Sequence, residues 1–191
     1  GALIGSATRP LGGWLADRWG GAKVTLGAFI GLVVSTLAVL WTLMQLTPNP
    51  DATPAIAFDN QSWFPAFLGF FMLVFASTGI GNGSTYKMIP SIFRREAEMA
   101  TTPGTAERDA ALVGATKKSS AAVGIIGAVG AIGGFFIPIA FNSPWVDNPL
   151  DATKSAFIAF TIFYAICALV TFVVYLRPQG ARVGELADVR I

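Results

Sequence analysis

An arginine lies inside the first apolar segment of the chain, which covers residues 1–16. Arg9 stands eight positions before Asp17, which marks the end of that segment. If the segment is a helix across a membrane, eight residues place the guanidinium about 12 Å from the surface of a core about 30 Å thick. A charge at that depth must face the protein interior or a water-filled cavity, and such residues indicate functional sites.

No acidic residue within the apolar segments can neutralise Arg9, because none of them contains Asp or Glu. A guanidinium stays charged at any relevant pH, and its planar donors match a planar oxyanion through two parallel hydrogen bonds. Nitrate, nitrite or a carboxylate would therefore suit it. The alternative is a structural ion pair between Arg9 and a carboxylate that precedes this chain in a longer protein.

Glycine and polar residues interrupt the third apolar segment, at Gly81, Asn82, Gly83 and Ser84. Interrupted helices are common where transporters bind or gate. Asn82 and Thr85 could hydrogen-bond a substrate, although a bond to a neighbouring helix is the preferred interpretation. We expect Lys87 to extend towards the nearer membrane surface and Pro90 to weaken the helix near its end.

Glycine recurs along the fourth apolar segment at three- and four-residue intervals, which places a smooth stripe on one helical face. Small residues let membrane helices approach closely, so the stripe predicts either a moving contact or static packing. The stripe consists of Gly124, Gly127, Gly130 and Gly134, with Gly133 beside them. A second small group, Gly13, Asp17, Arg18 and Gly20, ends the first segment and predicts a basic turn between two helices.

The composition requires a membrane around these groups. Of the 191 residues, 53% are hydrophobic and only 13% are charged, which leaves too little polar surface for a water-facing globule. The apolar runs are long and continuous, whereas barrel strands alternate over about 10 residues. We therefore expect an all-α bundle over residues 1–176, with spans at 1–16, 24–46, 63–92, 119–141 and 155–176.

Basic residues identify the side of the membrane on which each connection lies. Ten of the 13 Lys and Arg residues fall at 17–23, at 94–118 and in the tail 177–191. Cytoplasmic loops are enriched in these residues. The pattern thus predicts a multi-pass protein with these three regions, including the C-terminus, in the cytoplasm. Residues 103–118 could form a surface segment, with a short helix from Ala106.

Several functional classes are disfavoured by the same composition. The chain has no His and one Cys, so it offers no disulfide framework and no Cys/His metal site. We expect no metal and no cofactor. Nucleophile–base pairs are also missing, so an enzyme is not expected. Because the basic residues follow membrane sidedness, nucleic-acid binding is not expected either.

Three stretches resemble the NarK-type nitrate/nitrite porters of the major facilitator superfamily. Residues 4–25, IGSATRPLGGWLADRWGGAKVT, are similar to their eighth helix and the Gly-x-x-x-Asp-Arg-x-Gly signature that follows it. Residues 79–95, GIGNGSTYKMIPSIFRR, are similar to their tenth helix. Residues 121–141, AAVGIIGAVGAIGGFFIPIAF, are similar to the glycine-rich nitrate signature on their eleventh helix.

This resemblance implies a twelve-helix transporter of a bacterial inner membrane, of which the chain would be helices eight to twelve. Arg9 occupies the position of one substrate-clamping arginine of the family, and a second would come from an absent N-terminal half. The implied cargo is nitrate or nitrite, carried by exchange or with protons. A major facilitator transporter for another small organic anion is the alternative.

Overall fold

The computed structural model describes residues 1–46, 61–141 and 149–177, and helices account for nearly all of them. Within these residues five α-helices follow one another: α1 (Ala2–Trp19), α2 (Gly21–Met44), α3 (Phe64–Ala100), α4 (Ala106–Phe141) and α5 (Pro149–Thr171). A 3-10 turn, η2 (Gln61–Trp63), leads into α3, and a π-helical turn, η3 (Phe172–Leu176), ends α5. The described ranges contain no strand, which confirms the all-helical fold class.

Membrane-spanning length is present in four of these elements. Among the described residues, α2, α3, α4 and the segment Leu150–Leu176 are long and apolar enough to cross a bilayer. α1 is less apolar, because its 18 residues include Arg9, Asp17 and Arg18. The expected tail 177–191 lies outside the described residues except for Arg177.

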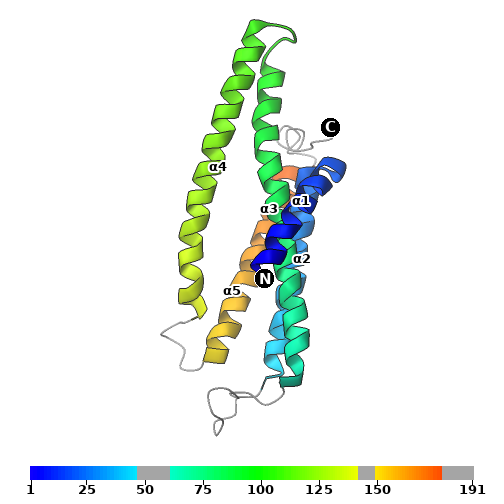
Figure 1. The fold of residues 1–191 in the computed structure, drawn as a ribbon, viewed down its shortest axis with the longest axis vertical. Coiled ribbons are helices and arrows are strands. Elements are labelled where there is room, and N and C mark those ends of the chain that lie inside the picture. The colour runs from blue at the N-terminus through cyan, green and yellow to red at the C-terminus, as the bar shows by residue number, and fades with distance from the viewer. Residues whose placement is uncertain (47–60, 142–148, 178–191) are drawn as a thin grey trace.

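Helix α3 lies at the centre of the bundle and packs against α1, α2 and α4, while α5 packs against α2 (Figure 1). Two buried clusters hold these helices together. The larger is built from Val39, Leu40, Leu43, Leu150 and Phe157, surrounded by aromatic side chains of α3. At the other end of the bundle, Ala22 and Met88 are packed against Ile92, Tyr175 and Leu176.

Two side-chain hydrogen bonds link α2 to its neighbours inside the apolar region. The hydroxyl oxygens of Thr25 and Ser84 lie 2.8 Å apart and join α2 to α3. Thr161 of α5 donates to the Thr36 hydroxyl of α2 over 2.9 Å. Such bonds fix the positions of membrane helices relative to one another, because a hydroxyl has no water to bond in the bilayer core.

The helices continue well beyond the apolar segments that the sequence indicates. The expected connection at residues 17–23 is a single-residue break at Gly20, whose φ of 91° lies in the left-handed region that favours glycine. The expected long connection at residues 94–118 is almost entirely helical, with only residues 101–105 between α3 and α4. Ala106 does begin a helix, but that helix is continuous with the fourth apolar segment.

The glycine-containing interruption of the third segment is also not a break. α3 runs through residues 81–84 and through Pro90 without interruption. Its 37 residues and the 36 of α4 correspond to lengths of about 55 Å, well beyond a core of about 30 Å. Residues 94–118, here called the α3–α4 hairpin, therefore project beyond the bilayer at one end (Figure 1).

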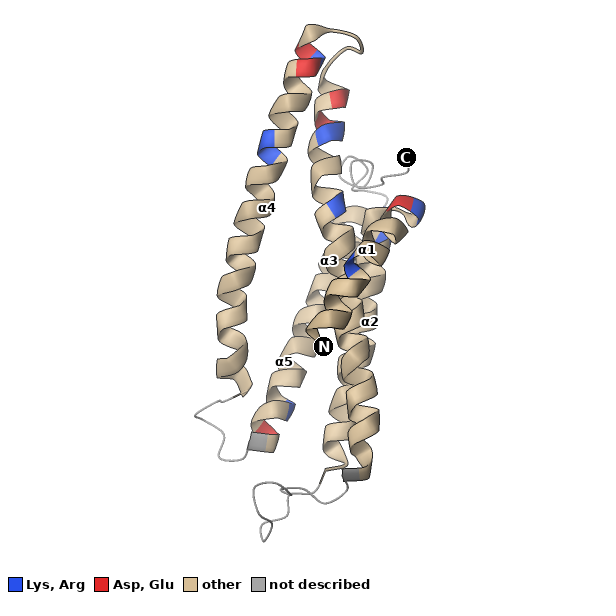
Figure 2. Ribbon diagram, viewed as in Figure 1, with Lys and Arg blue, Asp and Glu red and all other residues tan. Residues whose placement is uncertain are grey.

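Most of the charged residues in the described helices lie at that end of the bundle, which also holds the break at Gly20 and the end of η3 (Figure 2). We call it the charged end. Arg94 pairs with Glu98 over 2.9 Å along α3, and Arg108 of α4 lies 3.9 Å from the same carboxylate. These pairs connect the two helices of the hairpin where water surrounds them.

Candidate functional site

The candidate site is the crossing of α1 and α3, where the two backbones touch. A Cβ atom added to Gly83 of α3 would overlap the backbone carbonyl of Arg9, and one added to Gly12 of α1 would overlap the carbonyl of Ile80. At Gly79 an added Cβ would overlap both the carbonyl of Gly5 and the hydroxyl of Thr8. Helices approach this closely in membranes only where small residues meet. Glycine is thus required at the crossing for steric reasons.

The backbone carbonyl of Arg9 lies against Gly83 of α3 at this crossing. The side chain of Arg9 is exposed on the surface of the bundle. Among the described residues the guanidinium forms no ion pair, since the basic partners of the four ion pairs are Lys87, Arg94, Arg108 and Lys154. The helix that carries Arg9 is thus held rigidly against α3, and its charge is available to a group outside these five helices.

The acidic residue nearest to Arg9 in the sequence has another partner. Asp17, at the last turn of α1, forms an ion pair with Lys87 of α3. This pair closes the α1–α3 contact at the charged end, so Lys87 binds a neighbouring helix instead of extending alone towards the membrane surface. The second carboxylate oxygen, Oδ1 of Asp17, is buried without a hydrogen-bond partner among the described residues.

The rest of the basic-turn motif has a structural role in the described residues. Gly20 provides the left-handed backbone between α1 and α2. The guanidinium of Arg18 lies over the ring of Trp14, 5.6 Å from its centroid, in a cation–π contact. A Cβ atom added to Gly13 would lie at ordinary contact distance from the aliphatic part of Lys87. These residues lie at the end of the α1–α3 contact. From the sequence we expected them in a single turn between two helices.

Asn82 lies beside the crossing, because the next residue, Gly83, touches the backbone of Arg9. Neither Asn82 nor Thr85 has a side-chain hydrogen bond to another described residue, although both are partly buried in α3. The bond to a neighbouring helix that we expected from this segment comes from Ser84, which binds Thr25. Asn82 therefore remains a candidate for binding a group that approaches from outside the described helices.

The glycine stripe of α4 faces no described helix. Nothing lies within 4 Å of a Cβ atom added at Gly124, Gly127, Gly130, Gly133 or Gly134. All residues from 124 to 139 are exposed. The close helix contact that the stripe predicts is thus not made within this part of the chain, and the stripe remains a surface for another element.

This surface gives a first prediction. Gly130→Leu should fold normally in this part of the protein, because an added side chain meets open space. If the chain is part of an anion transporter, as the resemblance of its motifs implies, the variant should lower anion uptake severalfold, since a leucine keeps a facing helix at a distance. Uptake in proteoliposomes measures the effect, with Gly114→Leu as the control on the same helix, also in open space. Equal uptake by both variants would show that nothing packs closely on the stripe.

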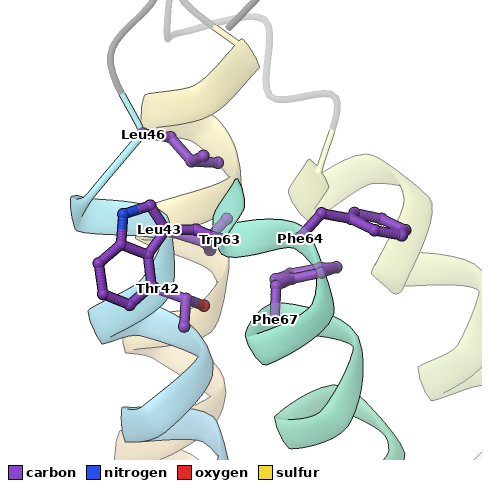
Figure 3. A pocket seen from close by; sticks show the side chains of 6 residues that line it. All are labelled: Thr42, Leu43, Leu46, Trp63, Phe64 and Phe67. Atoms are coloured by element: carbon purple, nitrogen blue, oxygen red, sulfur yellow. The ribbon is translucent and has the colours of Figure 1, made fainter. Parts of the chain in front are cut away.

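An apolar pocket at the opposite end is unsuited to an anion. It lies between the end of α2 and the start of α3, as Figure 3 shows. Its lining consists of Thr42, Leu43, Leu46, Trp63, Phe64 and Phe67. The one hydroxyl, that of Thr42, donates to the carbonyl of Val39 over 2.7 Å. No cation lines this pocket, and no group of acidic, Cys or His residues within the described ranges could hold a metal ion.

Comparison with characterised proteins identifies the family of the chain. No known family model matches the sequence. The nitrate/nitrite transporter NarU of Escherichia coli, however, is 36% identical over 181 residues, which is 94% of this chain. The chain belongs to the NarK-type nitrate/nitrite porter family. NarU of Salmonella typhimurium shows the same identity over the same length.

Other similar proteins bear related names. A Thermus thermophilus protein named as the nitrate/nitrite antiporter NarK2 is 37% identical over 93 residues, or 49% of the chain. The nitrate transporter NarT of Staphylococcus aureus is 25% identical over 183 residues. The chain spans about a third of the length of the NarU proteins, 36% of each. The resemblance found in its motifs is thus confirmed for the family.

Proposed function

We propose that the chain supplies five helices of a bacterial inner-membrane transporter that moves nitrate, nitrite or both by alternating access. The observation that carries this proposal is the exposed guanidinium of Arg9, which has no ion pair among the described residues. The names of its relatives support the choice of anion. Its planar donors can bind a trigonal oxyanion through two parallel hydrogen bonds.

In this proposal Arg9 forms one side of a binding site whose other side lies on helices that precede this chain in the complete transporter. A second cation there, together with Arg9, would bind the anion between them. Two facing cations repel each other in an empty site, so the occupied site favours closure. Asn82 lies beside the crossing that holds Arg9 and is a candidate for additional hydrogen bonds to the anion.

Exchange is favoured over proton-coupled transport by the charges in the chain. The described helices bear no Asp or Glu within their apolar spans, so they offer no carboxylate that could carry a proton. A binding site whose only charge is a cation should change its exposure from one side of the membrane to the other most easily with an anion bound, in both directions of transport. NarK2 of Thermus thermophilus is likewise named as an antiporter.

The charged end is assigned to the cytoplasm in the same proposal. It holds Gly20 with Arg18 and Lys23 beside it, the α3–α4 hairpin and the end of η3 at Arg177. Excess Lys and Arg on cytoplasmic connections support this orientation. The C-terminus is then also cytoplasmic.

Competition for uptake of labelled nitrate tests the proposed cargo. The complete transporter in proteoliposomes should take up nitrate, and unlabelled nitrate and nitrite should compete severalfold better than acetate or formate. All four ions are small monovalent anions, so the comparison isolates recognition of the nitrogen oxyanion. If the carboxylates compete best, the transporter carries a small organic anion. Absence of nitrate uptake would contradict the proposal altogether.

A further inference from the structure

A groove of about 300 Å³ lies where α1, α2 and α3 meet, near the charged end. It is separate from the stripe of α4 and from the apolar pocket at the other end. Most of its lining residues are apolar or small, and one cation, Lys23, lies at the end of the groove that is nearer the charged end of the bundle. Its principal residues are Leu15 and Trp19 of α1, Lys23, Gly27 and Ala28 of α2, and Ile80 of α3.

The position of Lys23 relates the groove to the membrane surface. Lys23 is the third residue of α2, next to the break at Gly20, and Ala28 lies five residues further along the helix. The groove therefore extends about 8 Å along α2, from the first turn towards the interior of the bilayer. Trp19, with 56% of its surface exposed, lies beside Lys23 at the level where tryptophan favours the membrane interface.

Among the described residues, Lys23 forms no ion pair that would neutralise its charge. Asp17 is the only acidic residue among residues 1–46, and its ion pair is with Lys87. Four described residues near this end of the groove, Arg18, Lys23, Lys87 and Asp17, together carry a net charge of +2. A negatively charged group is thus electrostatically favoured at the end of the groove.

We infer that this groove binds an anionic phospholipid, with the phosphate at Lys23 and part of one acyl chain along Gly27 and Ala28. Basic pockets between membrane helices bind anionic headgroups, and the combination of cation, interfacial tryptophan and apolar depth matches the parts of one lipid. A free inorganic anion would use the lysine but not the apolar walls. The inference does not depend on which anion the transporter carries.

Gly27 allows the groove to be filled without disturbing the helices. Nothing lies within 4 Å of a Cβ atom added there, and Gly27 lines the groove, so the side chain of Gly27→Leu should occupy it. Gly69 of α3 has the same open surroundings but does not line the groove, which makes Gly69→Leu a matched control. Lys23→Gln removes the positive charge that is proposed to bind the headgroup. Lys118→Gln is its control, because Lys118 is a cation of the charged end that does not line the groove.

The experiment is native mass spectrometry of the complete transporter with added phosphatidylglycerol or phosphatidylcholine. We expect selective retention of phosphatidylglycerol by the unmodified protein. Lys23→Gln should weaken its binding about fivefold, since one lysine near a membrane surface contributes about 1 kcal/mol to binding of anionic lipid. Gly27→Leu should also weaken it severalfold, and both controls should bind as the unmodified protein does.

Three results would each overturn the inference. The first is equal retention of the two lipids. The second is unchanged binding of phosphatidylglycerol by Lys23→Gln, which would place the headgroup elsewhere. The third is unchanged binding by Gly27→Leu, as expected if another helix of the transporter fills the groove. Circular dichroism of every variant establishes that the helices are formed, so a loss of binding is not a loss of fold.

Discussion

Replacing Arg9 by lysine in the complete transporter should reduce the apparent affinity for nitrate by about ten- to a hundredfold. Lysine preserves the charge but loses the planar pair of donors, and hydrogen bonds to charged groups contribute about 1.5–3 kcal/mol each. The helix itself should be unaffected, because the contact of α1 with α3 at this residue is made by the backbone carbonyl. The KM for nitrate uptake in proteoliposomes measures the effect.

Arg18→Lys is the matched control for that variant. Arg18 lies on the same helix at the charged end, where its guanidinium contacts the ring of Trp14. A lysine can make a similar contact with the ring, so nitrate uptake should remain near that of the unmodified protein. Equal KM values for Arg9→Lys and the unmodified transporter would remove Arg9 from the binding site. A carboxylate on a preceding helix, found against Arg9, would make its charge structural.

Gly83→Ala should impair both folding stability and transport, although it adds only one methyl group. That methyl would overlap the carbonyl of Arg9, so α1 must move away from α3. Inserting extra volume into a well-packed contact typically costs about 1–3 kcal/mol. The displacement also moves the residue that presents the guanidinium, so uptake should fall together with the thermal unfolding temperature in detergent.

Gly69→Ala is the control, because the surroundings of Gly69 on the same helix are open. Alanine has the higher helix propensity, so this variant should be as stable as the unmodified protein or slightly more stable. Unchanged stability and unchanged uptake in Gly83→Ala would show that α1 and α3 are further apart in the working transporter than in the structure described here.

The sequence predicted which segments are helical, but not where the helices end. Hydropathy identifies the part of a helix that contacts lipid. Where the helix continues into water its residues are polar, so hydropathy no longer indicates that the segment is helical. In α3 this continuation carries Arg94 and Glu98, four residues apart, which is a spacing that supports a solvated helix. The same spacing was visible in the sequence and could have extended the predicted helix.

The candidate site was predicted only in part for a related reason. The depth of Arg9 follows from its distance to Asp17 along one helix, which is local information. Its contact with Gly83 joins residues far apart in the chain, and no single-helix pattern specifies such a contact. The four-residue spacing of Gly79 and Gly83 was the available signal, yet we interpreted Gly83 only as part of an interruption at residues 81–84. In the structure, close contact with α1 accommodates them within a continuous helix.

The α3–α4 hairpin has a practical consequence. Its two helices run without a break from the water-exposed tip at residues 101–105 into the membrane, and Arg94, Glu98 and Arg108 tie them together just outside it. An antibody fragment that binds this tip would hold α3 and α4 in one fixed orientation relative to each other. Such a fragment would restrict the relative motion of α3 and α4 and would provide rigid mass for imaging the particle.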